Sequence, residues 1–343
     1  MRAFPSLAVV VFCACVDRGQ TTVSMDDVPA DDSDTPAAND TDTSGSCTPR
    51  APDRAVRLAV GSYYAVLADA ESVLTWGGVE FQDTSFPPPP AEWPAVALPV
   101  RSVSADGGAQ VCVVDADGAL HCLRTGVGWT PSGVPQSGLR SVASFSGGAC
   151  VLNDDGVHCV RSDPGEHAAV VELPGSWVEL AVGPTSENLD HLFDPATCAL
   201  DAGGHVGCAG PIGTDAIERI PCANELAMDE NAVLCWTSGS GRIHCVLRHE
   251  DAVSPAERDR AAWIDTLPTT EGWHDLALAR GYLCALDAEG SITCWGAAGP
   301  ERPPSGPGFV ALAGSEDATC AVRAGDAPIC WWGPASITAI GDR

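Results

Sequence analysis

CALDAEGSITCWG, which spans Cys284–Gly296, is the stretch of sequence that decides the fold, because copies of it recur along the chain. Five further copies keep both cysteines: CVVDADGALHC (112–122), CVLNDDGVHC (150–159), CALDAGGHVGC (198–208), CWTSGSGRIHC (235–245) and CAVRAGDAPIC (320–330). A seventh copy, AVLADAESVLTWG (65–77), has Ala65 and Thr75 at the two cysteine positions. Such self-similarity indicates a repeat architecture. The joint loss of both cysteines indicates that the two normally form a pair.

Each copy has the pattern of a β-hairpin with a disulfide across it. A short apolar strand leads into a turn rich in Asp and Gly, and a second strand follows. In the second copy the turn spans 115–118, and Gly118 can supply the positive φ that such a turn needs. Counting back from this turn places Cys112 opposite Cys122, close enough for a bridge. The six predicted hairpin disulfides are Cys112–Cys122, Cys150–Cys159, Cys198–Cys208, Cys235–Cys245, Cys284–Cys294 and Cys320–Cys330.

The repeat resembles that of the regulator-of-chromosome-condensation family, through the pattern Val-x-x-x-x-x-Gly…Cys-Ala-Leu-x-x-x-Gly-x-x-x-Cys-Trp-Gly. More closely, it is similar to the cysteine-paired form of that repeat in bacterial secreted lipoproteins. The match is best at Cys284–Gly296 and good at 65–77 and 112–122. The resemblance covers residues 55–343 and implies an all-β fold, a seven-bladed β-propeller built from hairpin repeats with disulfides inside the blades.

Another apolar strand precedes the hairpins and should be the inner strand of each blade. Examples are 56–61, 139–147, 276–281 and 309–314, each ending at a glycine. At the C-terminus, 336–340 alternates and is rich in β-branched residues. We expect this tail to close the ring by pairing with the first blade.

The first residues have the pattern of an export signal. Arg2 precedes a short apolar run, and Ala14 precedes Cys15 as in a lipoprotein signal. We therefore expect a signal peptide over 1–14, a lipid on Cys15, and an acidic, disordered tether over 15–54. Without the lipid, the protein would be secreted rather than anchored in the bacterial cell envelope.

Cysteine parity supports this organisation. The chain has 16 cysteines, of which Cys13 would leave with the signal and Cys15 would carry the lipid. The six hairpin pairs use twelve of the others, and Cys47 and Cys222 remain. We predict that these two also pair and fasten the tether to the propeller. So many disulfides require an oxidising compartment, in agreement with export.

The composition excludes several classes of function. The net charge is −28, from 46 acidic and 18 basic residues, and every basic residue is arginine. The absence of lysine excludes mechanisms that need its amine, and the negative charge argues against nucleic acid. We expect a monomer that touches the membrane only through its lipid and holds no cofactor. Three histidines precede the second cysteine of a pair, but this repeated strand position favours packing over metal binding: His121, His158 and His244.

Two consecutive copies break the regular spacing and are candidates for a binding surface. From the last inner-strand residue to the first cysteine, the fourth copy needs sixteen residues and the fifth needs fifteen. Insertions confined to one face often mark a binding surface, although two drifted loops would give the same pattern. The candidate residues are Glu187, Asn188, Asp190, His191, Asp194, Asn224, Glu225, Asp229, Glu230 and Asn231. Such a polar, acidic patch would suit a cation or a basic partner.

The sequence contains no local catalytic motif such as Gly-x-Ser-x-Gly or His-Glu-x-x-His. We therefore predict no catalytic residues and a non-enzymatic module that binds an unknown protein or small ligand. One alternative is an extracellular hydrolase with its site at the mouth of the propeller. A lesser alternative is regulation of a GTPase by family analogy.

Overall fold

The computed structural model describes most of the repeat region. The described residues are 56–61, 64–77, 96–105, 110–124, 127–129, 134–145, 148–161, 171–183, 196–210, 220, 222–229, 233–247, 262–279, 281–296, 303–315, 318–332 and 336–339. All of them belong to one compact unit, Thr43–Arg343. The predicted signal peptide (1–14) and tether (15–54) lie outside the described residues.

The described strands form seven antiparallel sheets that follow one another in chain order. The first sheet contains β1 (Arg57–Val60), β2 (Tyr64–Ala68) and β3 (Val73–Gly77). The second contains β4 (Ser102–Ala105), β5 (Gln110–Val114), β6 (Leu120–Arg124) and β7 (Val127–Trp129). The third contains β8 (Ser141–Phe145), β9 (Gly148–Leu152), β10 (Gly156–Arg161) and β11 (Val171–Pro174). The fourth contains β12 (Trp177–Gly183), β13 (Ala196–Asp201) and β14 (Val206–Ala209).

The remaining three sheets complete the series. The fifth contains β15 (Glu225–Met228), β16 (Val233–Thr237) and β17 (Ile243–Leu247). A short 3-10 helix, η1 (Ala262–Thr266), precedes the sixth sheet, which contains β18 (His274–Ala279), β19 (Tyr282–Leu286) and β20 (Ile292–Trp295). The seventh contains β21 (Phe309–Gly314), β22 (Ala318–Arg323), β23 (Ile329–Trp332) and β24 (Ser336–Ala339). Among the described residues, no helix has the length and apolar character needed to span a bilayer.

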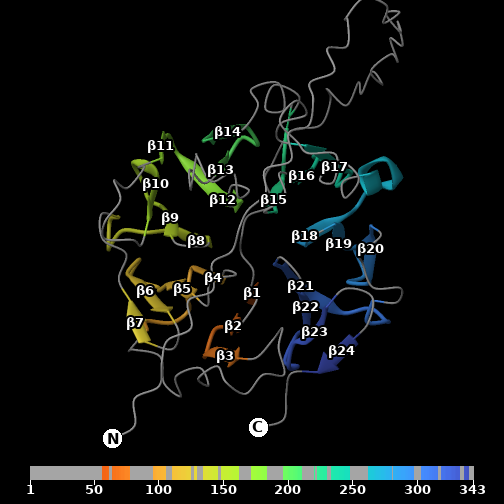
Figure 1. The fold of residues 1–343 in the computed structure, drawn as a ribbon, viewed down its shortest axis with the longest axis horizontal. Helices are drawn as coiled ribbons and strands as arrows, with labels where there is room; N and C mark the ends of the chain where they lie inside the picture. Colours follow the sequence, from red (N-terminus) through yellow and green to blue (C-terminus); the bar gives the residue numbers. More distant parts are fainter. Residues whose placement is uncertain are drawn as a thin grey trace, which may run out of the picture. The chain divides into compact units, whose positions relative to one another are not determined.

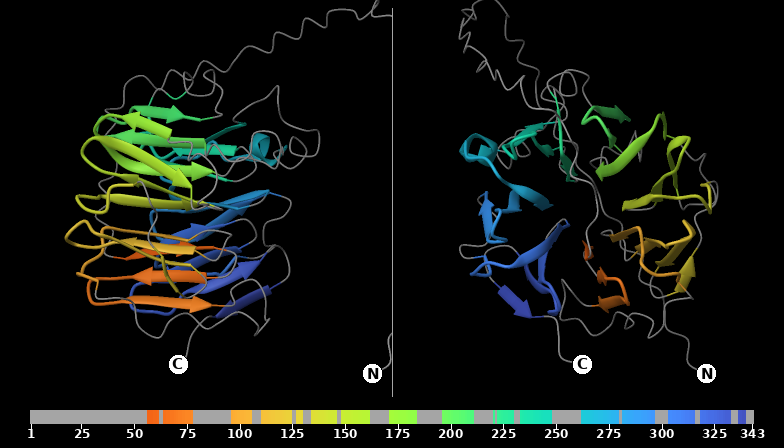
Figure 2. Two further views of the ribbon diagram at one scale, coloured as in Figure 1. Left: turned by 60° about the vertical axis from the view of Figure 1, so that its left-hand side comes forward. Right: turned by 180° about the vertical axis from the view of Figure 1, so that it is seen from behind.

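The seven sheets are the blades of a closed propeller (Figure 1). The first strand of each sheet contacts the first strand of the next, in the order β1, β4, β8, β12, β15, β18 and β21, and β21 contacts β1. The view from behind shows the same succession around a common axis (Figure 2). The predicted fold, an all-β seven-bladed propeller, is confirmed.

The hairpins and their disulfides are also confirmed. In each of the six cysteine-containing blades, the two cysteines face each other across the second and third strands, with Cα atoms 3.9–4.1 Å apart. Cys112 is directly opposite Cys122, in the register that the turn predicts. Cys222 is disulfide-bonded as well. Its predicted partner, Cys47, lies outside the described residues, so this pairing stays a prediction.

The first blade shows which residues replace a cysteine pair. Thr75 lies opposite Val66, and Ala65 lies opposite Trp76. The predicted replacement of the first cysteine by Ala65 is therefore wrong by one residue. The physical reason is the turn, which is one residue shorter here than in the second blade, so the facing residue moves along the strand.

The C-terminal strand does not close the ring by pairing with the first blade, as the sequence suggested. β24 pairs instead with β23 and forms the outer strand of the seventh blade. The ring closes by side-chain packing, in which Val60 and Ala65 of the first blade pack against Ala318, Cys320 and Cys330 of the last. Apolar contact can close the ring without shared strands because the inner strands β1 and β21 already lie side by side.

In several blades, the hairpin turn accepts a hydrogen bond from the entry of the next blade. The backbone N–H of Phe309, at the entry of the seventh blade, donates to the carbonyl of Gly290 in the turn of the sixth, at 3.0 Å. Gly118, Gly204 and Gly241 accept equivalent bonds from the blades that follow them. Gly290 has φ of 74°, and a Cβ there would lie 2.4 Å from the carbonyl oxygen of Phe309. Glycine is required both by the left-handed conformation and by this close approach.

Candidate functional site

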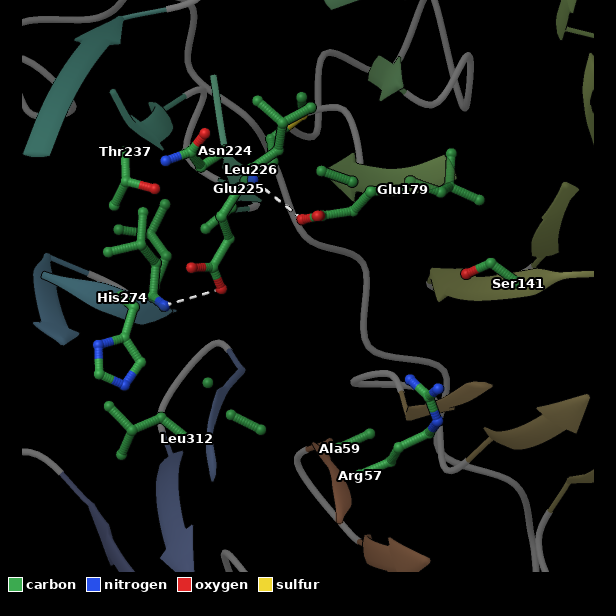
Figure 3. Close-up of a pocket in the computed structure, with 18 of the residues that line it drawn as sticks. Arg57, Ala59, Ser141, Glu179, Asn224, Glu225, Leu226, Thr237, His274 and Leu312 are labelled. Atoms are coloured by element: carbon green, nitrogen blue, oxygen red, sulfur yellow. Dashed lines mark hydrogen bonds between the residues drawn. The ribbon is translucent and has the colours of Figure 1, made fainter. Parts of the chain in front are cut away.

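The first strands of all seven blades enclose one cavity, here named the axial cavity. Its volume is about 700 Å³, and residues of β1, β4, β8, β12, β15, β18 and β21 line it. Thr237 and the segments 239–241 and 272–274 extend the lining on the side of the fifth and sixth blades. In the close-up, Arg57 and Ser141 lie on one side of the cavity, with Thr237 and His274 on the other (Figure 3). A concave site of this volume falls in the range of small-molecule pockets.

Carboxylates at the beginning of the inner strands join the fourth to seventh blades. Glu179 of β12 accepts a hydrogen bond from the backbone N–H of Leu226 at 3.0 Å, shown as a dashed line in Figure 3. Glu225 of β15 accepts from the N–H of Asp275 at 2.7 Å and of Leu276 at 3.1 Å. We name these bonds inter-blade clasps. They use charged acceptors for backbone donors, which are among the stronger hydrogen bonds in proteins.

Asp275 continues the series and also carries backbone strain. Its carboxylate accepts from the backbone N–H of Leu312 in β21 at 2.9 Å. Its φ is 58°, in the left-handed region, at a bulge between His274 and Ala277. Such a conformation persists only where the surroundings hold it. Here the bond from its own N–H to Glu225 is one of the contacts that hold it.

Serines take the place of the carboxylates between the second and third blades. The hydroxyls of Ser102 and Ser104 on β4 accept from the backbone N–H groups of Val142 at 3.3 Å and Ser144 at 2.7 Å on β8. Ser102 thus occupies the repeat position of Asp275, so acidic and hydroxyl side chains share this position, and Ser104 lies two residues further along β4. Sequence analysis missed this series. Its signal in the inner strands is a Glu, Asp or Ser residue that directly precedes the dipeptide Leu-Ala, Val-Ser or Val-Ala.

Three arginines line the cavity on the first three blades. The guanidinium of Arg57 donates to the carbonyl of Val100 at 3.1 Å. Arg101 donates to the carbonyls of Leu139 at 3.0 Å and Ala116 at 2.6 Å. Each arginine therefore reaches the residues that lead into the following blade. Sequence analysis did not single them out, because their separation along the chain hides their convergence on one cavity.

Arg140 makes the corresponding contact between the third and fourth blades. It donates to the carbonyl of Trp177 at 3.2 Å and forms an ion pair with Asp154 of its own hairpin turn. The Asp154 side chain is 80% exposed, so water screens this pair.

The structure corrects the predicted loop of the fifth copy. The inner strand of that blade is β15, which lies inside the segment taken as a long loop after Ile220. Asn224 and Glu225 therefore stand at the beginning of this strand and line the axial cavity. Asp229 follows the other end of the strand, is buried, and accepts from the N–H of Val233 at 2.8 Å. The strand escaped prediction because it has four residues between polar neighbours.

The remaining predicted binding residues lie outside the described residues: Glu187, Asn188, Asp190, His191, Asp194, Glu230 and Asn231. In the fourth copy the connection is long in the structure as well, because β12 ends at Gly183 and β13 begins at Ala196. The described members of the set do not form one surface, since Asn224 and Asp229 lie at opposite ends of β15.

The three histidines beside disulfides have different environments. His121 bonds to the carboxylate of Asp115 at 2.8 Å, and His244 stacks on Trp236 with ring centroids 5.3 Å apart. His158 lies opposite Val151 in the third blade. Across the described ranges, no group of three or more His, Cys, Asp or Glu is placed to hold a metal ion.

Asp115 illustrates the electrostatics of the hairpin turns. Burial raises the pKa of this carboxyl, but hydrogen bonds from His121 and from the N–H of Ala119 outweigh it. The net result is a pKa below the ordinary value of aspartate. The ionised carboxylate thus accepts the hydrogen bonds that stabilise the turn.

Several solved structures resemble this chain at low sequence identity. The WD40 ectodomain of the Arabidopsis thaliana receptor kinase ACR4 matches with a TM-score of 0.52 and 18% identity, over 86% of this chain and 99% of that one. Human WBSCR16 matches with a TM-score of 0.53 and 14% identity, over 79% and 88%. Yeast RCC1 (Prp20), solved with Kap60, matches with a TM-score of 0.39 and 16% identity, over 80% and 69%. The first two agree with the propeller fold that the repeat resemblance implies.

No protein-family model matches the sequence. None of the curated proteins matches it either. These likenesses therefore show the fold alone.

Proposed function

We propose that the protein is an exported, lipid-anchored propeller that binds a protein or small ligand outside the cytoplasm and catalyses no reaction. The observation that carries the proposal is the construction of the axial cavity. Its lining carboxylates Glu179 and Glu225 hold backbone N–H groups of the following blades. They thereby serve the rigidity of the ring, which presents a fixed surface to a partner.

This use of the carboxylates argues against a hydrolase at the propeller mouth. A general acid or base must exchange a proton with a substrate within hydrogen-bond reach. Protonation of Glu225 would weaken its bonds to the N–H groups of Asp275 and Leu276, which are themselves buried. The binding function requires no such change.

The proposed location rests on the disulfides and on the N-terminal pattern. Six bonded pairs are typical of an oxidising compartment. Arg2, the apolar run and Ala14 before Cys15 support export and lipidation at Cys15. The proposal includes a monomeric chain without a cofactor, whose membrane contact is the lipid.

Part of the recognition surface is proposed to lie in the long connection after β12. That connection contains Glu187, Asn188, Asp190, His191 and Asp194, an acidic and polar set that suits a cation or a basic partner. Glu230 and Asn231, which follow β15 in the chain, are included on the same ground. Alanine at all seven positions should weaken binding of a partner, and an unchanged affinity would remove these residues from the proposal.

Peptide mass mapping without reduction, on protein from the membrane fraction, tests location and anchoring together. We expect the six hairpin pairs, a lipid on Cys15, and loss of membrane retention in Cys15→Ala but not in Cys13→Ala. Free thiols with an intact Met1 would contradict export. A mature chain with disulfides but no lipid would contradict the anchor alone.

A further inference from the structure

The axial cavity differs from the rest of the chain in the balance of its charges. Among the described residues, its charged lining residues are three arginines and two glutamates: Arg57, Arg101, Arg140, Glu179 and Glu225. The whole chain has 18 basic and 46 acidic residues. The potential inside a cleft follows the charges on its walls, because the low-dielectric walls focus their field. The cavity can therefore attract an anion although the chain carries a net charge of −28.

The arginines occupy one sector of this cavity. Arg57 lies on β1, and Arg101 and Arg140 directly precede β4 and β8, so the three belong to consecutive blades. Ser102 and Ser141, the next residues in the chain, also line the cavity there. Arg57 and Ser141 lie on the same side of the cavity in Figure 3, opposite His274. Guanidinium and hydroxyl groups of three consecutive blades thus line one sector of the cavity, and both kinds of group can donate hydrogen bonds to an oxyanion.

Backbone carbonyls hold the guanidinium groups in place. Arg101 spans the carbonyls of Leu139 and Ala116, which are neutral acceptors and leave its positive charge uncancelled. A guanidinium fixed in this way loses less freedom when it binds a ligand. Arg140 shares its charge with the highly exposed Asp154, which leaves it a weaker contributor than Arg101.

The two glutamates of the cavity do not cancel this sector. Both stand on the fourth and fifth blades, and their carboxylates point to the N–H groups of the blade that follows. Those N–H dipoles offset part of the negative charge locally. The arginines and the glutamates thus lie on different blades and line different sectors of the cavity.

We infer that the arginine sector of the axial cavity binds a small organic anion through a carboxylate or phosphoryl group. This inference rests on the proposed binding function and adds to it a ligand for the axial cavity, separate from the surface proposed after β12. A cavity of about 700 Å³ suits a small molecule rather than a protein segment. A guanidinium carries five N–H donors, so Arg101 has donors for an oxyanion beyond the two that bind the carbonyls of Leu139 and Ala116.

Carbonyl contacts alone do not make an arginine part of this site, and Arg323 provides the matched control. It donates to the carbonyls of Ser305 at 2.9 Å and Pro307 at 3.3 Å and lies 3.9 Å from the ring centre of Phe309. It is absent from the lining of the axial cavity. Replacing it removes the same charge and the same kind of contact without touching the proposed site.

The test is calorimetric titration of the full mature chain with citrate and, separately, with inorganic phosphate at low ionic strength. We expect at least one of the two to bind, and its identity distinguishes a carboxylate ligand from a phosphoryl ligand. Arg101→Gln should weaken binding about tenfold or more, the loss expected for one charge-assisted hydrogen bond. Arg101→Lys should keep part of the affinity, and Arg323→Gln should leave it unchanged.

Absence of binding by both probes, or equal affinity of Arg101→Gln and the unaltered chain, would overturn the inference. Disulfide mapping of each variant shows whether its blades are intact, so a folding defect is separated from a binding defect. The proposed function fails independently, through free thiols or an unprocessed N-terminus. A protein partner that still binds Arg101→Gln would leave the binding module standing and remove only the anion site.

Discussion

Each carboxylate of the inter-blade clasps can be replaced by its amide. Of these substitutions, Glu225→Gln should destabilise the propeller most. The carboxylate accepts two backbone bonds, from Asp275 at 2.7 Å and from Leu276 at 3.1 Å. Glutamine keeps one acceptor oxygen and turns an NH2 group toward the other donor. Loss of one bond to a charged group costs about 1.5–3 kcal/mol, with a similar burial penalty if the donor stays unpaired. We expect a loss of about 2–4 kcal/mol, and more in Glu225→Ala.

The assay is urea unfolding at neutral pH without reductant, with the free energy of unfolding extrapolated to water. Glu71→Gln is the control, because it removes the same charge from an exposed side chain in the first hairpin turn. Surface changes of that kind stay within about 0.5 kcal/mol. If Glu225→Gln and Glu71→Gln lost the same free energy, the clasp would contribute nothing beyond net charge, and the reasoning would be refuted.

Three further results are expected. The free energy of unfolding in urea should fall by at least about 1 kcal/mol more in Gly290→Ala than in Gly325→Ala. Both glycines have positive φ, but only at Gly290 does a Cβ meet backbone atoms. Equal losses would count against the turn-to-blade contact. Cys112→Val with Cys122→Thr, which copies the facing pair of the first blade, should fold and lose about 2–3 kcal/mol; failure to fold would show that the bond is obligatory. The pKa of Asp115 is lower in the folded than in the unfolded chain, so its stabilisation is complete above the unfolded pKa and is lost as pH falls through the folded pKa. Asp115→Asn should therefore make the free energy of unfolding less dependent on pH below about pH 4. An unchanged pH dependence would exclude this carboxyl as its source.

The parts of the fold that sequence could predict are those coded locally. A hairpin with a turn and two cysteines lies within about a dozen residues, so the register of Cys112 and Cys122 followed from counting. The shorter turn of the first blade shifted that count by one residue, and Ala65 was placed where Val66 stands. The inner strand β15 was missed because its four residues carry little periodic signal.

The site could not be predicted in the same way because its contacts are distant in sequence. Glu225 meets Leu276 across 51 residues, and Arg101 meets Leu139 across 38. A single sequence shows these residues as isolated charges, which are usually solvated surface groups. Only the arrangement of the blades in a ring brings each of these residues against the following blade, where its role becomes visible.

Two kinds of side chain therefore pair with the backbone polar groups at the entries of the blades. Backbone groups at the entry of each inner strand need partners, since buried polar groups left unpaired are costly. Glu179, Glu225 and Asp275 satisfy N–H donors, whereas Arg57 and Arg101 satisfy carbonyl acceptors. Among the described lining residues, the acids are on the fourth and fifth blades and the arginines on the first to third, so the same scaffold contacts give the cavity an acidic and a basic sector. A binding preference can thus arise from residues that were first required to hold the blades together.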